Sequence, residues 1–487
     1  MREISAENKI FGLKPLSFIG ILAILQVAIA FLTEPMIFSF DESMWQYIGR
    51  NWFRNGLVPY AGGVDNKSPL IFLIFGISDW LFGVNFWFPR LLGTLTESVG
   101  VFLIFKIAEK SISRRAALFA ISFYGLSLLW RSTGGKYVSY TETYAVTAIL
   151  AAIWFTLFCT RKKYSFIGGF IAGLGFGFRF SAGFGIAPLF LFAIRKNRKA
   201  AILFLAGLIS AIILLVLLAF ISGIQISEFL LYGFTDNFST GSPTDHSLAW
   251  KAQAFADGFF YSELLLFYPA VFYYFILNRK IDFLKVWLFS EFLGIIVIGI
   301  FDRVHFKNLL PVMSLMSAFV VNWLLENYKM NASYLLMGIW ILFFPKTFEP
   351  LFAIKRIFIS QNSLSASDGR LKTWDEQDSK KKIGLWLRSN TMPGEKIFIA
   401  GYSAEIQAYS ERVSPSIYFN VTQTPRARKK LFADLNSNMP ALVVIPLSDR
   451  YTNSVSADIR SFVDRIVENN YVRDTSLYNY AVFRYKK

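Results

Sequence analysis

Charged residues, cysteine and the common nucleotide-binding and metal-binding motifs are scarce or absent in this chain. Only 17% of its 487 residues are charged, whereas 54% are hydrophobic and 18% are aromatic. Soluble domains carry about 25% charged residues, so the composition indicates a membrane protein. The single cysteine, Cys159, excludes an internal disulfide. The sequence has no Walker loop, GxGxxG, HExxH or CxxC motif, which argues against nucleotide-driven transport and a nucleotide-binding Rossmann domain.

Positive charge is abundant but is divided into short runs. The net charge is +17, and many lysines and arginines lie between apolar segments, as in residues 161–163 and 195–199. A nucleic-acid-binding protein would cluster them on a soluble domain, so we expect no nucleic-acid partner. Basic runs between apolar segments instead follow the positive-inside rule. The rule predicts that these runs and the N-terminus face the cytoplasm.

Apolar runs suited to membrane spans, which need about 20 residues, recur through residues 1–348, the predicted transmembrane domain. They lie near residues 16–33, 88–107, 115–131, 142–160, 164–179, 181–194, 200–222, 257–277, 283–301, 308–327 and 332–348. A further apolar stretch, residues 69–84, would invert the orientation of the later basic runs if it crossed the bilayer. We therefore predict a re-entrant or interfacial helix there and about eleven transmembrane helices. The same reasoning places the N-terminus in the cytoplasm and the C-terminus outside. The protein is expected to be integral to the cytoplasmic (inner or plasma) membrane.

Two of the predicted spans, residues 164–179 and 181–194, are short and are separated only by Phe180. A glycine-rich run, residues 168–177, precedes this break, and Arg179 lies at it. Irregular backbone within a membrane is tolerated where it lines a cavity. Small residues also permit close packing between helices. The sequence leaves both interpretations open.

The chain changes character after residue 348, because long apolar runs stop and polar residues become more frequent. Short strands are predicted at residues 396–400, 441–447 and 480–485. Helical patterns lie near residues 375–389, 425–437 and 456–469. Residues 349–487 are therefore predicted to form a soluble α/β domain on the extracytoplasmic side.

The segment between the first predicted span and residue 87 is expected to form the first outer loop, residues 34–87, with interfacial helices. Asp41 and Glu42 follow the span almost at once, and residues 42–54 fit an amphipathic helix with Trp45 and Trp52 facing inward. A carboxylate at the water–lipid boundary can act as a general base toward an acceptor hydroxyl. The alternative is that these residues form an ordinary charged cap after a span, because an Asp-Glu pair alone is very common.

The spacing of the motifs around this loop is more specific than the acidic pair. The pattern consists of Asp41-Glu42, Gly56-x-x-Pro59-Tyr60, Asp65-x-Lys67-x-Pro69, Leu81-Phe82-Gly83 and Arg90-Leu91. It resembles the GT-C membrane glycosyltransferases, and more narrowly the group that contains the protein O-mannosyltransferases and the lipid A aminoarabinose transferases.

Later residues extend the resemblance. Glu142 matches a second acidic residue at the outer end of a span, and Arg179 closes a glycine-rich span where the group usually has lysine. Arg303, His305 and Phe306 precede Leu310-Pro311, and Phe306 replaces the usual tyrosine.

The resemblance implies an inverting hexosyl or pentosyl transferase whose donor is a sugar on a polyprenyl-phosphate carrier. Asp41 would be the general base. Glu42 and Glu142 would also belong to the catalytic residues, and Glu142 would position the acceptor, or a metal ion if one is used. The other implied roles are carrier-phosphate binding for Lys67, Arg179, Arg303 and His305, and substrate positioning for Tyr60 and Asp65.

The partners implied are the lipid-linked donor, membrane lipids and an acceptor whose nature stays open: a lipid, a glycan or a protein. We assign no cofactor and no metal ligands. Members of the group differ in their dependence on a divalent metal ion, so metal dependence stays open as well.

Two acidic residues do not fit this scheme. Glu97 and Glu291 fall near the middle of predicted spans, where a charged residue is usually paired or functional. They support an alternative function as a membrane transporter or lipid flippase. A non-catalytic scaffold for the outer domain is a third hypothesis, but it leaves Asp41, Lys67 and Arg179 unexplained.

Overall fold

The computed structural model describes most of the chain. The residues outside the description are 1–14, 34–39, 131–132, 136–137, 236–247, 300, 329, 361–368, 402–403, 420–423, 448–454 and 487. Two compact units are present. The helical unit comprises residues 1–33, 90–218 and 246–356, and the mixed unit comprises residues 34–89, 219–245 and 357–487.

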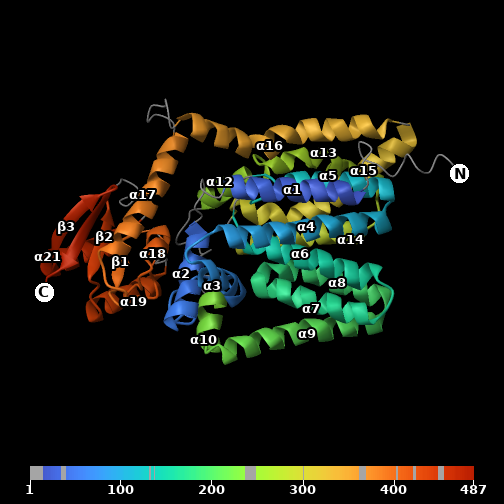
Figure 1. The fold of residues 1–487 in the computed structure, drawn as a ribbon. Helices are drawn as coiled ribbons and strands as arrows, with labels where there is room; N and C mark the ends of the chain where they lie inside the picture. The colour runs from blue at the N-terminus through green and yellow to red at the C-terminus, as the bar shows by residue number, and fades with distance from the viewer. Residues whose placement is uncertain are drawn as a thin grey trace. The chain divides into compact units, whose positions relative to one another are not determined.

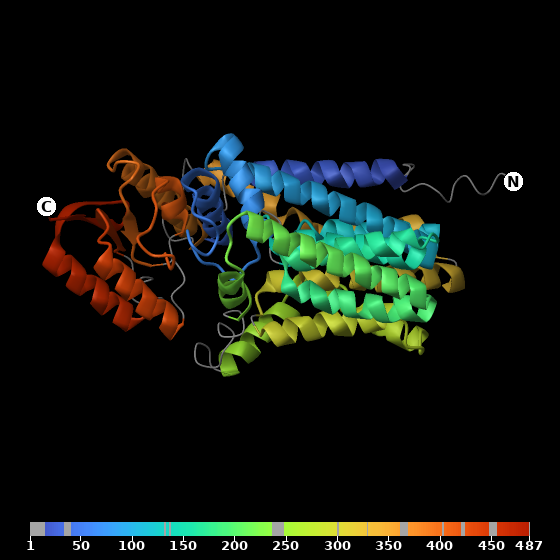
Figure 2. The ribbon, with the colours of Figure 1, turned by 90° about the horizontal axis from the view of Figure 1, so that it is seen from below.

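The helical unit consists of long helices that run along a common direction (Figure 1, Figure 2). Helix α6 packs along α7, α5 along α15, and α8 along α14. The elements that lie wholly or mostly in this unit are α1 (Pro15–Thr33), α4 (Trp87–Ser111), α5 (Arg114–Ser127), α6 (Thr141–Ile153), η3 (Trp154–Phe158), α7 (Lys163–Phe178), η4 (Phe180–Ala182), α8 (Gly183–Lys196), α9 (Arg198–Ile221), α12 (Leu248–Phe259), η6 (Glu263–Leu266), α13 (Tyr268–Leu277), α14 (Phe283–Ile298), η7 (Arg303–Leu309), α15 (Leu310–Tyr328) and α16 (Ala332–Ser360).

Four helical stretches of the described chain are long and apolar enough to cross a membrane. They are Trp87–Ser111, Thr141–Phe158, Arg198–Ile221 and Arg303–Tyr328. Shorter apolar helices occur at Ser17–Ala28, Pro69–Phe82, Tyr268–Leu277 and Ala332–Phe343. A membrane protein with several spans is therefore supported, and the total of about eleven remains a prediction.

The predicted break near residue 180 is confirmed. Helix α7 ends at Phe178, Arg179 adopts an extended conformation with φ −154° and ψ 121°, and the short helix η4 leads into α8. The glycines before the break permit close helix packing. A Cβ atom on Gly169 would lie 1.8 Å from the carbonyl oxygen of Phe204 on α9. Small residues therefore do permit close packing between α7 and α9. The backbone at Arg179 is irregular as well.

The mixed unit contains a four-stranded sheet in the order β1-β2-β4-β3 (Figure 1). β1 pairs with β2 in parallel, while β4 pairs antiparallel with both β2 and β3. The elements of this unit are α2 (Phe40–Asn55), α3 (Pro69–Phe82), α10 (Ile226–Glu228), η5 (Phe229–Thr235), α17 (Gly369–Ser389), β1 (Ile397–Ile399), α18 (Ala404–Ser410), α19 (Pro425–Ser437), β2 (Leu442–Pro446), α21 (Ala457–Asn470), β3 (Tyr471–Leu477) and β4 (Tyr480–Tyr485).

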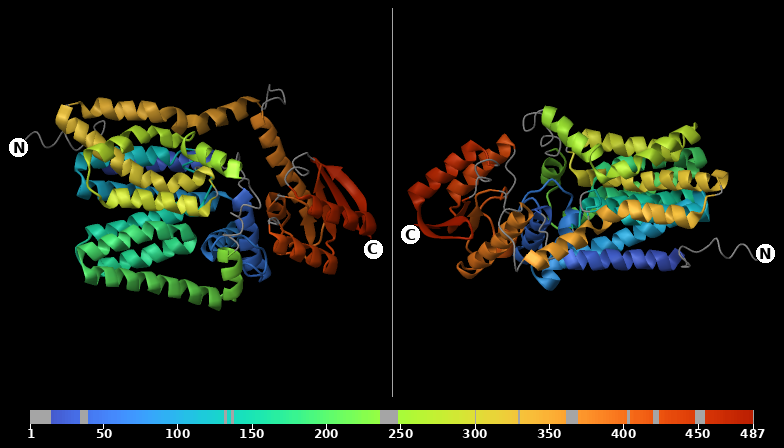
Figure 3. Two further views of the ribbon diagram at one scale, coloured as in Figure 1. Left: turned by 180° about the vertical axis from the view of Figure 1, so that it is seen from behind. Right: turned by 90° about the horizontal axis from the view of Figure 1, so that it is seen from above.

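Both faces of the sheet are covered by helices (Figure 3). Side chains alternate between the two faces of a strand, and the two cores follow this rule. Phe398 and Val443 pack in one core with α19 and α21. Ile397 and Leu442, one residue earlier on the same strands, pack in the other core with α17 and α18.

The three predicted strands and the three predicted helices of the C-terminal region are confirmed as β1, β2, β4, α17, α19 and α21. Two elements were not predicted. Strand β3 is largely exposed and lacks an apolar pattern, and α18 has only seven residues, all of them buried. Neither sequence shows the alternation that an amphipathic element produces.

The first loop packs with the C-terminal residues inside the mixed unit. The Ser414 backbone N–H donates to the Tyr47 hydroxyl at 2.8 Å, and the Val64 backbone N–H donates to the Ile417 carbonyl at 3.0 Å. The rings of Tyr47 and Phe419 lie 4.2 Å apart. Residues 34–89 therefore pack in one unit with residues 357–487. The predicted domain boundary after residue 348 separates a transmembrane domain from an extracytoplasmic domain, and it remains a prediction.

The amphipathic helix predicted at residues 42–54 is present as α2. Trp45 and Ile48 are fully buried, while Trp52 and Phe53 are half-buried. The apolar helix predicted at residues 69–84 is α3, which has 14 residues and packs along α2. Its position relative to a membrane remains a prediction.

We expect Gly207→Ala to destabilise the helical unit, because the new Cβ atom would lie 2.0 Å from the Phe166 carbonyl oxygen. Overpacking of this kind costs about 1–3 kcal/mol. The control is Gly338→Ala on α16, where nothing lies within 4 Å of the added atom. Thermal unfolding of the detergent-purified protein should show a lower Tm for the first variant only, and equal Tm values would contradict the close approach of α7 and α9.

Candidate functional site

The acidic pair of the first loop lies at the start of α2. Asp41 and Glu42 occupy the first turn, where carboxylates interact favourably with the helix dipole. Glu42 is fully buried, whereas Asp41 is half-buried. Both residues have interaction partners. Of the two, Asp41 is the more accessible to a substrate.

Lys67 is carried by a loop with a dense set of hydrogen bonds. Its Nζ donates to Asn66 Oδ1 at 2.6 Å, and its backbone carbonyl accepts from the Tyr60 hydroxyl at 2.6 Å. Asp65 accepts from Trp45 Nε1 at 2.7 Å and from the Asn66 backbone N–H at 2.7 Å. Tyr60 therefore holds the backbone carbonyl of Lys67, and Asp65 holds the backbone N–H of the preceding residue, Asn66.

Tyr60 has an unusual backbone. Its φ is +71°, a value that L-residues other than glycine rarely adopt. The ring is fully buried and packs against Phe229 and Tyr232. Burial, and secondarily the charge of Asp65, raises the pKa of the Tyr60 phenol well above 10. The phenol therefore stays protonated and remains a donor to Lys67.

A second group of predicted residues meets inside the helical unit. Glu142, in the first turn of α6, is 2% exposed and forms an ion pair with Arg179 at the helix break. The same carboxylate oxygen lies 3.8 Å from Nε2 of His305 on η7. Arg179 also donates through Nε to Ser181 Oγ at 2.6 Å. Arg179 and His305, which are distant from each other in the sequence, thus share the Glu142 carboxylate.

The two unexplained acids have partners in the same unit. Lys307 Nζ lies 2.6 Å from Glu97 Oε1 and donates to Thr143 Oγ1 at 2.7 Å. Glu291 accepts from Trp287 Nε1 at 3.0 Å and from Asn308 Nδ2 at 3.1 Å. These partners explain why the Glu97 and Glu291 carboxylates can be buried, so their burial requires no transport role.

Lys307 was not singled out from the sequence. The signal was a lysine directly before the predicted span at residues 308–327, in a chain with a glutamate inside another predicted span. Arg303, on the same short helix, is half-buried and takes part in neither ion pair.

The predicted site residues therefore fall into two groups, each within one unit. Glu142, Arg179, Arg303 and His305 belong to the helical unit, and Asp41, Glu42, Tyr60, Asp65 and Lys67 belong to the mixed unit. Among the residues that the structure describes, no group of three or more His, Cys, Asp or Glu side chains could hold a metal ion.

Comparison with solved structures shows that the chain has the GT-C fold of membrane glycosyltransferases. It superposes on ArnT from Cupriavidus metallidurans bound to undecaprenyl phosphate with a TM-score of 0.64 and 12% identity, over 96% of this chain and 97% of that one. The oligosaccharyltransferase of Archaeoglobus fulgidus in complex with Zn and sulfate gives a TM-score of 0.55 at 13% identity, over 89% of this chain and 69% of that one. The archaeal oligosaccharyltransferase AglB from Archaeoglobus fulgidus, in complex with an inhibitory peptide and a dolichol-phosphate, gives a TM-score of 0.54 at 13% identity, over 90% of this chain and 70% of that one.

A family model, dolichyl-phosphate-mannose-protein mannosyltransferase, matches residues 66–223. This segment contains Lys67, Glu142 and Arg179 but ends before His305 and begins after Asp41. No curated protein matches the chain in sequence. The family match and the fold confirm the resemblance, and they indicate a glycosyltransferase that is an integral membrane protein.

We expect Lys307→Met to destabilise the protein strongly, because Glu97 would then be a buried charge without its cation. Breaking a buried ion pair costs about 3–5 kcal/mol, and the two side chains are 1% and 6% exposed. Thermal unfolding should show the loss in the single variant and its recovery in Glu97→Gln/Lys307→Met. The control is Lys106→Met, which breaks a pair of the same 2.6 Å length whose side chains are 33% and 26% exposed. If both lysine variants changed Tm equally, the pairing of Glu97 would not matter for stability.

Proposed function

We propose that the chain is a glycosyltransferase that takes a sugar from a polyprenyl-phosphate carrier at the outer face of the cytoplasmic membrane. The observation that carries the proposal is the cluster of buried Glu142 with half-buried Arg179 and His305 at a helix break in a chain with the GT-C fold. Two of the structures with this fold hold a polyprenyl-phosphate ligand, undecaprenyl phosphate or dolichol-phosphate.

The cluster suits a phosphate group for electrostatic reasons. Ionisable side chains within a membrane domain are expensive and usually functional. Arg179 and His305 belong to different elements and reach one carboxylate, so their positions are fixed before a ligand arrives. Fixed cations stabilise the negative charge that develops on a leaving phosphate. Arg303, on the same helix as His305, is proposed to contribute further positive charge. The role of Lys67 in binding the carrier phosphate is proposed from the sequence resemblance alone.

The proposed reaction is a single displacement at the anomeric carbon. Asp41 accepts the proton of the acceptor hydroxyl, and the acceptor oxygen forms a new bond to the anomeric carbon. The bond between that carbon and the carrier phosphate oxygen breaks, and its electron pair leaves with the polyprenyl phosphate. Attack opposite the leaving group inverts the configuration of the sugar. Glu42 and Glu142 are assigned to acceptor positioning, and Tyr60 and Asp65 act by holding the Lys67 loop.

The membrane arrangement belongs to the proposal. About eleven spans, a cytoplasmic N-terminus and an extracytoplasmic C-terminal domain would expose the Asp41 loop at the outer face. The transporter alternative rested on Glu97 and Glu291. Since both have hydrogen-bonding partners within the helical unit, no observation favours transport over transfer.

We expect Asp41→Asn to lower the rate of transfer by about 10²–10⁴, the usual contribution of a general base. The measurement is the release of polyprenyl phosphate from a panel of polyprenyl-phosphate-linked sugars, with purified protein in liposomes and an extract of membrane lipids and glycans as acceptor. Asp474→Asn is the control, because Asp474 lies exposed on β3 in a surface pair with Arg484.

Undiminished turnover in Asp41→Asn would remove Asp41 as the base. If Glu97→Gln or Glu291→Gln instead abolished lipid flux while Asp41→Asn had a mild effect, the transport function would replace the proposed one.

A further inference from the structure

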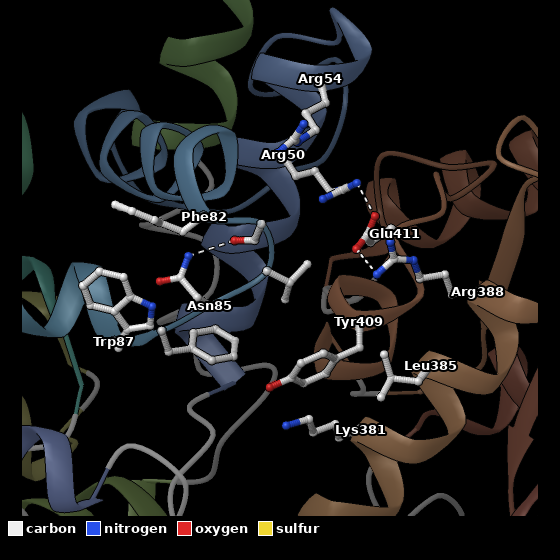
Figure 4. A pocket seen from close by; sticks show the side chains of 13 residues that line it. Arg50, Arg54, Phe82, Asn85, Trp87, Lys381, Leu385, Arg388, Tyr409 and Glu411 are labelled. Carbon is white, nitrogen blue, oxygen red and sulfur yellow. Dashed lines mark hydrogen bonds and ion pairs between the residues drawn. The ribbon is translucent and has the colours of Figure 1, made fainter.

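A pocket of about 620 Å³ lies within the mixed unit, between the ends of α2 and α3 and the helices α17 and α18 (Figure 4). It contains none of the residues to which a catalytic role is assigned. Arg50, the lining residue of α2 closest to Asp41 in sequence, lies nine residues after it, about 13–14 Å along the helix axis. The pocket is therefore separate from the proposed catalytic carboxylate.

The charges that line the pocket are predominantly positive. Arg50 and Arg54 reach it from α2, and Lys381 and Arg388 from α17, whereas Glu411 is the one carboxylate among the lining residues. Figure 4 shows Glu411 between Arg50 and Arg388, the latter at 2.6 Å. The lining thus holds four cations and one carboxylate, and two of the cations pair with that carboxylate.

A buried carboxylate behind the pocket fixes two of these arginines. Asp79 on α3 is fully buried and lies 3.0 Å from Arg50 and 2.9 Å from Arg54. Gln46 also donates to Asp79 at 2.8 Å. The guanidinium groups are therefore held in place without a ligand, and counting Asp79 with Glu411 still leaves four cations against two carboxylates. Planar guanidinium groups held in this way are suited to bind phosphate oxygens.

An exposed apolar patch adjoins the positive pocket. Trp80, Leu81 and Phe82, in the last turn of α3, are 59%, 51% and 48% exposed, and Phe82 lines the pocket. The rings of Phe82 and Trp87 pack at 4.8 Å. Aromatic residues concentrate at the interface between membrane and water, and a large exposed apolar patch usually has a partner.

We propose that this pocket binds the phosphate head group of an anionic membrane phospholipid, whose acyl chains lie against the patch formed by Trp80, Leu81 and Phe82. A phospholipid carries the two chemistries that the site offers, a phosphate for the cations and hydrocarbon for the apolar patch. Basic pockets of membrane proteins bind the head groups of anionic lipids, and the interfacial position predicted for α3 would bring this pocket to the membrane surface. A soluble phosphate would satisfy the cations but would leave the apolar patch exposed to water.

The test measures binding of short-chain phosphatidylglycerol to the detergent-purified full-length protein by native mass spectrometry. The variant is Lys381→Gln/Arg388→Gln, which removes two exposed lining cations and leaves Arg50 paired with Asp79 and Glu411. We expect its affinity to fall by about tenfold or more, the effect of losing charge-assisted contacts to a phosphate. The control is Lys382→Gln, because Lys382 is adjacent in sequence but lies over the Tyr478 ring, away from the lining.

Each outcome decides the assignment. Loss of phosphatidylglycerol binding in the double variant, with retention in Lys382→Gln and unchanged thermal unfolding, supports the proposal. Equal binding by all three proteins overturns it. Equally tight binding of phosphatidylcholine overturns the anionic head group, and displacement of the lipid by millimolar inorganic phosphate overturns the lipid in favour of a soluble anion.

Discussion

The arrangement of the helical unit depends on partners for buried carboxylates, either cations or hydrogen-bond donors. Glu97, Glu142 and Glu291 are each less than 5% exposed, and an uncompensated charge at such positions would cost several kcal/mol. One short helix meets all three. His305, Lys307 and Asn308 of η7 lie against Glu142, Glu97 and Glu291 in turn. The path of η7 is thus constrained by α4, α6 and α14 together, and this constraint places the predicted phosphate-binding residues.

The mixed unit also contains a buried carboxylate that is paired with cations. Asp79 is the buried charge there, and Gln46, Arg50 and Arg54 of α2 converge on it. The ion pair between Arg50 and Glu411 then links α2 to the C-terminal residues. The same contacts that join α2 to α3 also orient the cations of the pocket.

Much of this organisation could be predicted from the sequence, but the pairing of charges could not. Hydrophobic runs and basic clusters predicted a membrane protein, the helix break at Arg179 and the strands β1, β2 and β4. Glu97 and Glu291 stood out as isolated charges, yet their partners could not be named. Lys307 lies 210 positions from Glu97 in the chain, and a single sequence contains no information on contacts of that range. The association of the first loop with residues 357–487 was missed for the same reason. The motif spacing around Asp41 predicted the fold class, because it combines several residues at a characteristic spacing. The roles that the resemblance gives these residues remain predictions.

The order of the strands has a consequence for biosynthesis. β4 comes last of the four strands in the chain but lies inside the sheet, where it pairs with both β2 and β3. Until residues 480–485 have left the ribosome, β2 has no neighbour on that side and β3 has no partner at all. Domains generally fold as units during synthesis, so this sheet would close only after translation of β4. Until then, the nascent chain would hold β2 and β3 with unpaired backbone groups, a state in which chaperone binding and quality control are most needed.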